Sequence, residues 1–167
     1  SLIVILIAAS FLSDNTILPL VGSIFGFLAL NWYPSKVFMG DSGSTFLGTV
    51  FVAILFRFDN TLNTIVLLLI ASPLLIDAAS CVIRRFLFGY DIFKGHKMHL
   101  YQRLNQSGLS HSLVSLIYIS CSTVLSFTYL FFGLKFLIIS CFLVFILGIY
   151  LDSSIAVPFL PIKKNKL

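Results

Sequence analysis

An aspartate between two glycines is the first group in this chain whose setting suggests chemistry. Asp41 lies in KVFMGDSGSTFLG, residues 36–48, where Gly40 and Gly43 would let the backbone approach a ligand closely. A helix that begins here, capped by one of the following serines, would offer free N–H groups and a partial positive charge. A carboxylate at such a helix start suits a hard cation, Mg²⁺ or Mn²⁺, that bridges phosphate oxygens. From these residues alone, a charge that simply caps the helix explains Asp41 equally well.

Two histidines and an arginine form a second group, in RRFLFGYDIFKGHKMHLYQRLNQSGLSH, residues 84–111. His96 and His99 are three residues apart and Arg103 follows four residues later, so on one helix the three side chains would share a face. Two imidazoles and a guanidinium suit the binding of phosphate groups. The histidine pair would also suit a transition metal, although no third Cys, His or Glu stands at a suitable spacing. A basic loop that rests on anionic lipid is a further alternative.

A third candidate is an aspartate inside an apolar stretch. Asp77, in SPLLIDAASCVIRR, lies seven residues before Arg84, which places both on one helix face near the end of that stretch. An ionisable residue at such a depth is a functional candidate by default. A structural ion pair between Asp77 and Arg84 is an equally good interpretation.

The composition indicates what must position these groups. Of the 167 residues, 59% are hydrophobic and 10% are charged, and the mean hydropathy is +1.06. Soluble domains are typically about 45–50% apolar, so we expect an all-α, polytopic bundle of transmembrane helices. All the acidic residues are aspartates, which excludes HExxH-type zinc sites and glutamate-based acid–base catalysis. The three cysteines lie inside apolar stretches and are interpreted as core or lipid-facing residues, neither disulfides nor metal ligands: Cys81, Cys121 and Cys141.

Apolar runs predict six helical segments, of which about five or six would span the bilayer. They lie near residues 1–12, 16–31, 44–57, 62–83, 112–131 and 135–151, with tight turns at 13–16, 58–61 and 133–135. The chain begins inside an apolar run, so we expect a truncated first span and a longer protein upstream.

Lysine and arginine gather on one set of connections. The loops 32–43 and 84–111 and the basic tail 152–167 carry nine of them, against Arg57 and Lys135 on the other side. By the positive-inside rule the long loops are cytoplasmic. Topology and anionic headgroups then account for the net charge of +5, and nucleic-acid binding is not expected.

The stretch from Asn31 to Ser44, which reads Asn-x-x-Pro-(small)-x-x-Phe-Met-Gly-Asp-x-Gly-Ser, resembles a family signature. The family is the polyprenyl-phosphate N-acetylhexosamine-1-phosphate transferases (glycosyltransferase family 4). These integral membrane enzymes include undecaprenyl-phosphate sugar-1-phosphate transferases and phospho-N-acetylmuramoyl-pentapeptide transferase. The resemblance implies that Asp41 is a catalytic Mg²⁺ ligand. It also implies that Asn31 and Phe38 line a uridine pocket, with the phenyl ring stacked on the base.

The segment HKMHLYQRLNQSGLSH is similar to the last cytoplasmic loop of the same family. The resemblance implies that His96 and His99, together with Arg103, contact the diphosphate of the nucleotide sugar, and Asp77 joins the substrate-binding residues as a hypothesis. The form His-x-x-His-Leu-Tyr-Gln-Arg-Leu resembles the branch that acts in O-antigen synthesis, whereas the peptidoglycan branch usually carries a run of adjacent histidines.

The expected activity is transfer of an N-acetylhexosamine 1-phosphate from a UDP-sugar to undecaprenyl phosphate, with release of UMP. This step would start a lipid-linked surface glycan of the O-antigen or lipopolysaccharide type in a bacterial inner membrane. The expected partners are UDP-N-acetylhexosamine, undecaprenyl phosphate and the lipid bilayer, and a homodimer is left open. The family carries further acidic residues in earlier loops, including an Asp pair, which these 167 residues lack. A catalytically incomplete fragment, a peptidoglycan-branch enzyme and a transport protein therefore remain alternatives.

Overall fold

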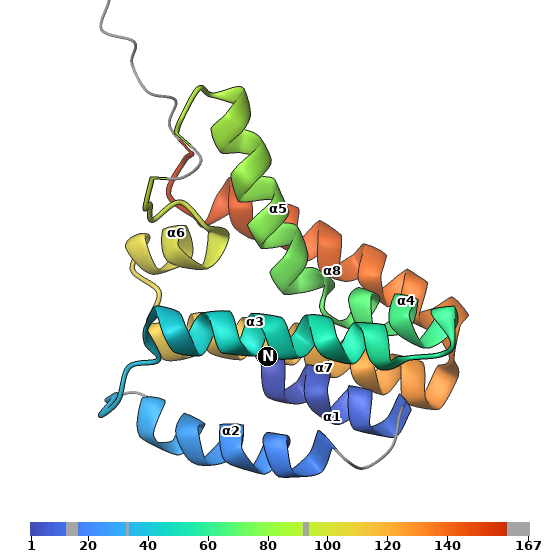
Figure 1. Ribbon diagram of the computed structural model, residues 1–167. Helices are drawn as coiled ribbons and strands as arrows, with labels where there is room; N and C mark the ends of the chain where they lie inside the picture. The colour runs from blue at the N-terminus through green and yellow to red at the C-terminus, as the bar shows by residue number, and fades with distance from the viewer. Residues whose placement is uncertain (13–16, 33, 92–93, 160–167) are drawn as a thin grey trace, which may run out of the picture.

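The computed structural model describes residues 1–12, 17–32, 34–91 and 94–159. Within these ranges the chain is all-helical, as expected from its composition (Figure 1). The helices are α1 (Leu2–Leu12), α2 (Leu18–Asn31), α3 (Gly40–Arg57), α4 (Thr61–Ile70), α5 (Ser72–Leu87), α6 (Leu100–Gln106), α7 (His111–Phe132) and α8 (Leu134–Ser154). The turn predicted at 13–16 and the end of the basic tail lie outside the described residues.

Local polar groups and a glycine set several of these helix ends. The Asn60 side chain accepts a hydrogen bond from the backbone N–H of Leu62 at 2.9 Å and so caps α4. Ser110 caps α7 in the same way, with Leu113 N–H as donor. Between α7 and α8, Gly133 has a φ of +78°, which reverses the chain in a single residue. The two helices then pack along each other as the most extensive pair in the described structure.

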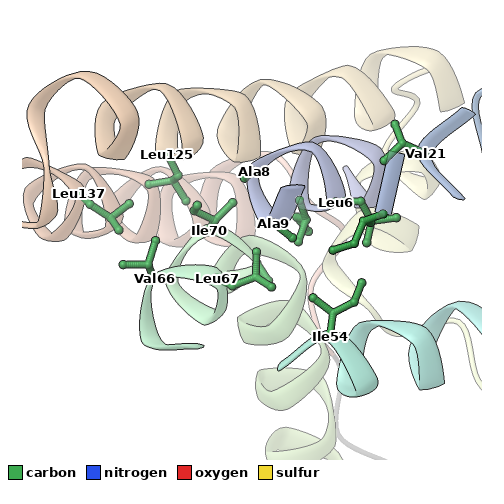
Figure 2. Packing of buried hydrophobic residues seen from close by; sticks show 13 residues of the cluster. Leu6, Ala8, Ala9, Val21, Ile54, Val66, Leu67, Ile70, Leu125 and Leu137 are labelled. Atoms are coloured by element: carbon green, nitrogen blue, oxygen red, sulfur yellow. The ribbon is translucent and has the colours of Figure 1, made fainter. Parts of the chain in front are cut away.

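The core forms where α1 packs among α2, α4 and α7. Figure 2 shows aliphatic side chains from six helices meeting there, and the fully buried ones include Leu6, Leu67 and Leu125. Ala8 and Ala9 of α1 are also buried. Small residues let helix backbones approach closely, which gives membrane helices their van der Waals packing where no hydrophobic effect separates helix from lipid.

The segment 62–83 was predicted as one continuous helix, and this is wrong, because two helices replace it. The structure breaks this segment at Ala71 into α4 and α5, whose axes are bent by 72°. The break follows from Pro73, which has no N–H for a continuing helix and whose ring would clash with the carbonyl four residues earlier. As a result α5 leaves the direction of α4 (Figure 1). Asp77 of α5 contacts the start of α6 through Leu100 N–H.

Two of the described helices, α7 and α8, are long and apolar enough to cross a membrane, and the bent pair of α4 and α5 would make a third span. Both long helices agree closely with the predicted segments. Two shorter apolar helices, α1 and α2, fall below that length. The predicted loop 84–111 contains the last turn of α5 and the whole of α6, and α3 begins four residues before its predicted start.

Candidate active site

Asp77 lies at the centre of the contacts between α5, α6 and α7. Its carboxylate is buried and accepts hydrogen bonds from the backbone N–H of Leu100 at 2.7 Å and of Tyr101 at 3.4 Å. The hydroxyl of Tyr118 on α7 donates a third bond at 2.7 Å. A buried carboxylate is stable only when such donors replace its water. Asp77 therefore fixes the start of α6 against α5 and α7.

The ion pair between Asp77 and Arg84, one of the two interpretations of Asp77, is not formed, because Arg84 pairs with another carboxylate. Arg84 Nη2 lies 2.6 Å from Asp152 Oδ2, at the end of α8. Asp152 also pairs with Arg103, which is 5% exposed and donates to the backbone carbonyl oxygens of Val157 at 2.9 Å and Met98 at 3.2 Å. The sequence analysis did not predict a role for Asp152. The signal that could have indicated one was the position of this carboxylate at the edge of the last apolar segment.

His96 and His99 lie together but not on one helix face with Arg103, so that prediction is wrong. The helix α6 begins only at Leu100, and His99 occupies its N-cap position. The two imidazole rings are stacked, with centroids 5.1 Å apart and planes inclined by 29°. His99 Nδ1 lies 3.7 Å from Asp77 Oδ1. Arg103 is held by the other partners described above. The structure therefore brings the two histidines together, whereas Arg103 stabilises the contact between α6 and the end of α8.

The electrostatic setting of His96 favours its neutral form. Burial lowers the pKa of the imidazole below its ordinary value, and the neighbouring Arg85 and His99 lower it further. A neutral imidazole carries one N–H donor and one unprotonated nitrogen. His96 can therefore donate to a phosphate oxygen or bind a cation through the other nitrogen.

Cys81 of α5 joins the two histidines. Its Sγ lies 4.0 Å from His96 Nδ1, and one ligand atom from each of Cys81, His96 and His99 lies within 4.8 Å of the others. The loop returns to α5 because the buried guanidinium of Arg85 donates to the backbone carbonyl oxygens of Asp91 and, at 3.0 Å, of Lys94. The proximity of Cys81 to His96 could not be predicted from spacing along the chain, since fifteen residues separate the two.

Asp41 lies in the first turn of α3 and is exposed. The helix begins at Gly40, whose φ of +63° suits a residue without a Cβ. The expected serine cap is not formed: the N-cap position is Met39, and Ser44 Oγ donates to the backbone carbonyl of Asp41 at 2.9 Å within the helix.

A cavity of about 570 Å³ contains the two residues assigned to a uridine pocket, Asn31 and Phe38. The Phe38 ring is 80% exposed and so has a free face for stacking. Asn31 Nδ2 donates to the carbonyl of Val37 at 2.7 Å, which closes the loop after α2. Tyr101 and Tyr118 line the same cavity and connect it to the Asp77 region. Asp41 is not among the lining residues.

Asp41, but not the group of Cys81 and the two histidines, has the donor chemistry that the expected Mg²⁺ requires. Magnesium takes oxygen ligands, usually one or two carboxylates together with phosphate oxygens and water. Asp41 offers one exposed carboxylate at a helix start, so it fits as a single ligand that leaves other positions to substrate oxygens. The sulfur and nitrogen donors of Cys81, His96 and His99 do not fit magnesium.

Comparison with known proteins shows that the chain is similar to transferases. Residues 1–59 match the sequence model of glycosyl transferase family 4. The chain is 30% identical over 139 residues to the probable undecaprenyl-phosphate N-acetylglucosaminyl 1-phosphate transferase of Bacillus subtilis strain 168. The alignment covers 81% of this chain and 39% of that protein. The first third of the chain is thus similar to glycosyl transferase family 4. The resemblance expected from the two motifs is thereby confirmed.

Other relatives in the family come from two kinds of enzyme. The chain is 35% identical over 113 residues to decaprenyl-phosphate N-acetylglucosaminephosphotransferase of Mycobacterium leprae, covering 59% of this chain and 28% of that protein. It is 46% identical over 65 residues to phospho-N-acetylmuramoyl-pentapeptide-transferase of Helicobacter hepaticus, covering 39% of this chain and 17% of that protein. The chain thus spans less than half the length of these relatives. No solved structure matches it.

Proposed function

We propose that this chain is part of an enzyme that transfers an N-acetylhexosamine 1-phosphate from a UDP-sugar to undecaprenyl phosphate. The products are UMP and the lipid diphosphate sugar that starts a surface glycan of the O-antigen type. The observation that carries the proposal is the 30% identity over 139 residues to a protein named for this kind of reaction. The stacked histidines and the cavity that holds Asn31 and Phe38 supply groups that suit a nucleotide diphosphate.

The reaction is a phosphoryl transfer. An oxygen of the lipid phosphate attacks the β-phosphorus of the UDP-sugar, the bond from that phosphorus to the bridging oxygen breaks, and UMP leaves with the electron pair. His96 and His99 would donate N–H bonds to the diphosphate oxygens and hold them in line. Asp41 would hold Mg²⁺, which when bound neutralises charge on the diphosphate. Phe38 would stack on the uracil ring, as its exposed face allows.

Two residues first assigned to substrate receive a different role. Asp77 and Arg103 are buried and engaged by protein groups: Asp77 with α6 and Tyr118, Arg103 with Asp152 and two carbonyl oxygens. In the proposed enzyme they act by positioning. Asp77 fixes the N-cap residue His99, and Arg103 ties α6 to the end of α8.

The proposed enzyme is a polytopic protein of the bacterial inner membrane, with about five or six of the apolar segments as spans. The long connections that carry the histidines and Asp41 face the cytoplasm, as their lysines and arginines favour. The polyprenyl tail then stays in lipid while its phosphate reaches the site.

The test is release of UMP from UDP-N-acetylglucosamine in membranes that contain undecaprenyl phosphate and the protein as its gene encodes it. Asp41→Asn is expected to abolish release, whereas Asp59→Asn, in an exposed turn before α4, serves as the matched control. Full activity of Asp41→Asn would refute the metal assignment. Absence of release with every UDP-sugar tested would refute the proposed reaction.

A second candidate is favoured by one observation, the 46% identity over 65 residues to a phospho-N-acetylmuramoyl-pentapeptide-transferase. The two candidates differ in the sugar that they accept. Release of UMP from UDP-N-acetylmuramoyl-pentapeptide, and not from UDP-N-acetylhexosamines, would establish the second candidate over the first.

A further inference from the structure

We propose that Cys81, His96 and His99 form a binding site for a divalent cation that prefers sulfur and nitrogen ligands, of which Zn²⁺ is the representative. The three side chains come from α5 and from the loop before α6, and their ligand atoms lie within 4.8 Å of one another. Thiolate and imidazole are the preferred ligands of zinc, and sites with three protein ligands leave a fourth position open.

The ligand atoms, which lie within 4.8 Å of one another, must move closer by up to about 1.4 Å to bind one cation. With Zn–S near 2.3 Å and Zn–N near 2.0–2.1 Å, ligand atoms in a tetrahedral site are separated by about 3.4–3.6 Å. The Cys81 Sγ to His96 Nδ1 distance is 4.0 Å. His96 and His99 lie in a loop and at a helix N-cap, where side chains move by such amounts without disturbing a packed core. Cys81 is held in place by α5, so the loop closes onto it.

The carboxylate of Asp77 lies next to His99, one of the proposed ligands. Asp77 Oδ1 lies 3.7 Å from His99 Nδ1, which leaves Nε2 of His99 for the cation. Histidines that bind metals commonly direct their second nitrogen to a carboxylate, which fixes the ring and raises its basicity. Asp77 is in turn fixed by Leu100, Tyr101 and Tyr118. The proposed ligands therefore have an oriented supporting group made entirely by the described chain.

The site has a consequence for the proposed enzyme, and this step rests on the proposed function. If His96 and His99 hold the diphosphate, a cation bound to both nitrogens removes them from the substrate. Zn²⁺ and the UDP-sugar would then compete, and the transferase would be inhibited by zinc. The cation site itself does not depend on the reaction, since it follows from the positions of the three side chains.

The cation site is tested with Co²⁺, a spectroscopic substitute for Zn²⁺, added to the purified full-length protein in detergent without a polyhistidine tag. We expect a near-ultraviolet thiolate-to-cobalt charge-transfer band that Zn²⁺ abolishes. Cys81→Ala should lose the band. Cys121→Ala and His111→Gln, at residues outside the group, should keep it. Asp77→Asn should weaken binding by about 10–100-fold.

Two results would overturn the site: absence of the band in the wild-type protein, or a band that survives in Cys81→Ala. Should Cys81→Ala fail to fold, as judged by gel filtration, His96→Gln and His99→Gln decide instead, because each removes one ligand from the half-buried side of the group. A band of unchanged intensity and affinity in both histidine variants would equally refute the site.

Competition is measured separately, as inhibition of UMP release by Zn²⁺. We expect inhibition of the wild-type protein that is relieved by more UDP-sugar and is lost in Cys81→Ala, which is outside the proposed catalytic residues. Equal inhibition of both proteins would refute competition at this site. A protein that shows the cobalt band but never releases UMP would keep the cation site and refute the proposed function.

Discussion

Replacing Asp77 by asparagine should open the start of α6 while leaving the rest of the fold intact. The carboxylate accepts from Leu100 N–H and Tyr118 O–H at 2.7 Å and from Tyr101 N–H at 3.4 Å. In Asp77→Asn one acceptor oxygen becomes an NH₂ group. The Tyr118 hydroxyl can turn and accept from it, but a backbone N–H cannot. The variant therefore loses the longest bond and the charge that strengthens the other two.

The magnitude follows from these bonds. Hydrogen bonds to a charged group contribute about 1.5–3 kcal/mol, against about 1 kcal/mol for neutral pairs. We expect α6 to become less stable toward local opening by about 2 kcal/mol, which corresponds to an open population about 30-fold larger. Local opening controls the exchange of backbone amide hydrogens with solvent. Hydrogen exchange at Leu100 and Tyr101 is therefore the appropriate assay, measured by mass spectrometry on the protein in detergent.

Two control variants make the result specific. Tyr118→Phe removes one donor and keeps the charge, so we expect a smaller increase in exchange, equivalent to about 1 kcal/mol. Asp59→Asn, in an exposed turn, should leave α6 unchanged. Exchange at Leu100 in Asp77→Asn within about twofold of wild type would refute the reasoning, because even one lost neutral bond predicts a larger change. Faster exchange spread evenly over α7 and α8 would also refute it, since that pattern reports global destabilisation.

Three further predictions concern other parts of the chain. Asp152→Ala leaves the 5% exposed Arg103 without its carboxylate and should cost about 3–5 kcal/mol, seen as a lower unfolding temperature in detergent, with Asp59→Ala as control. Gly133→Ala should destabilise the protein by about 1–3 kcal/mol, because φ is +78° there. Gly148→Ala, inside α8 with open space around it, should stabilise the helix. The same unfolding assay checks both variants, and equal effects of the two would contradict the argument. Phe38→Ala should raise the KM for the UDP-sugar by about 5–150-fold, the loss of about 1–3 kcal/mol of base stacking, while exposed Phe46→Ala should leave KM unchanged.

The helices could be predicted from the sequence where a long apolar run and a local break determine them. The segments predicted at 112–131 and 135–151 became α7 and α8, because both are uniformly apolar and Gly133 separates them. The segment at 62–83 was predicted as one helix, because apolar composition alone does not reveal a bend. Pro73 was the local signal that the helix could not continue.

Some residues of the candidate site could be predicted from the sequence, but their arrangement in space could not. His96 and His99 do lie together, but the reasoning that placed them on one helix face with Arg103 failed because α6 starts after both. The approach of Cys81 and the pairing of Asp152 join segments that are 15 to 68 residues apart. Periodicity describes one element at a time, so contacts made by folding of the loop onto α5 leave no regular spacing.

The charges around the site also limit how a diphosphate can be attracted to it. The charged groups at the ends of α5 and α8 are engaged by protein partners: Asp152 pairs with Arg84 and Arg103, and Arg85 donates to backbone carbonyl oxygens. Asp77 accepts from Leu100 N–H and the Tyr118 hydroxyl. Each is occupied by protein partners, so the scaffold adds little field for a ligand in water. On the loop, Lys94 and Lys97 flank His96 and are exposed. Exposed charges are screened by salt over about 8–10 Å. In the proposed enzyme, binding of the UDP-sugar to this loop should therefore weaken with ionic strength, unlike the anchoring of α6, which depends on buried pairs.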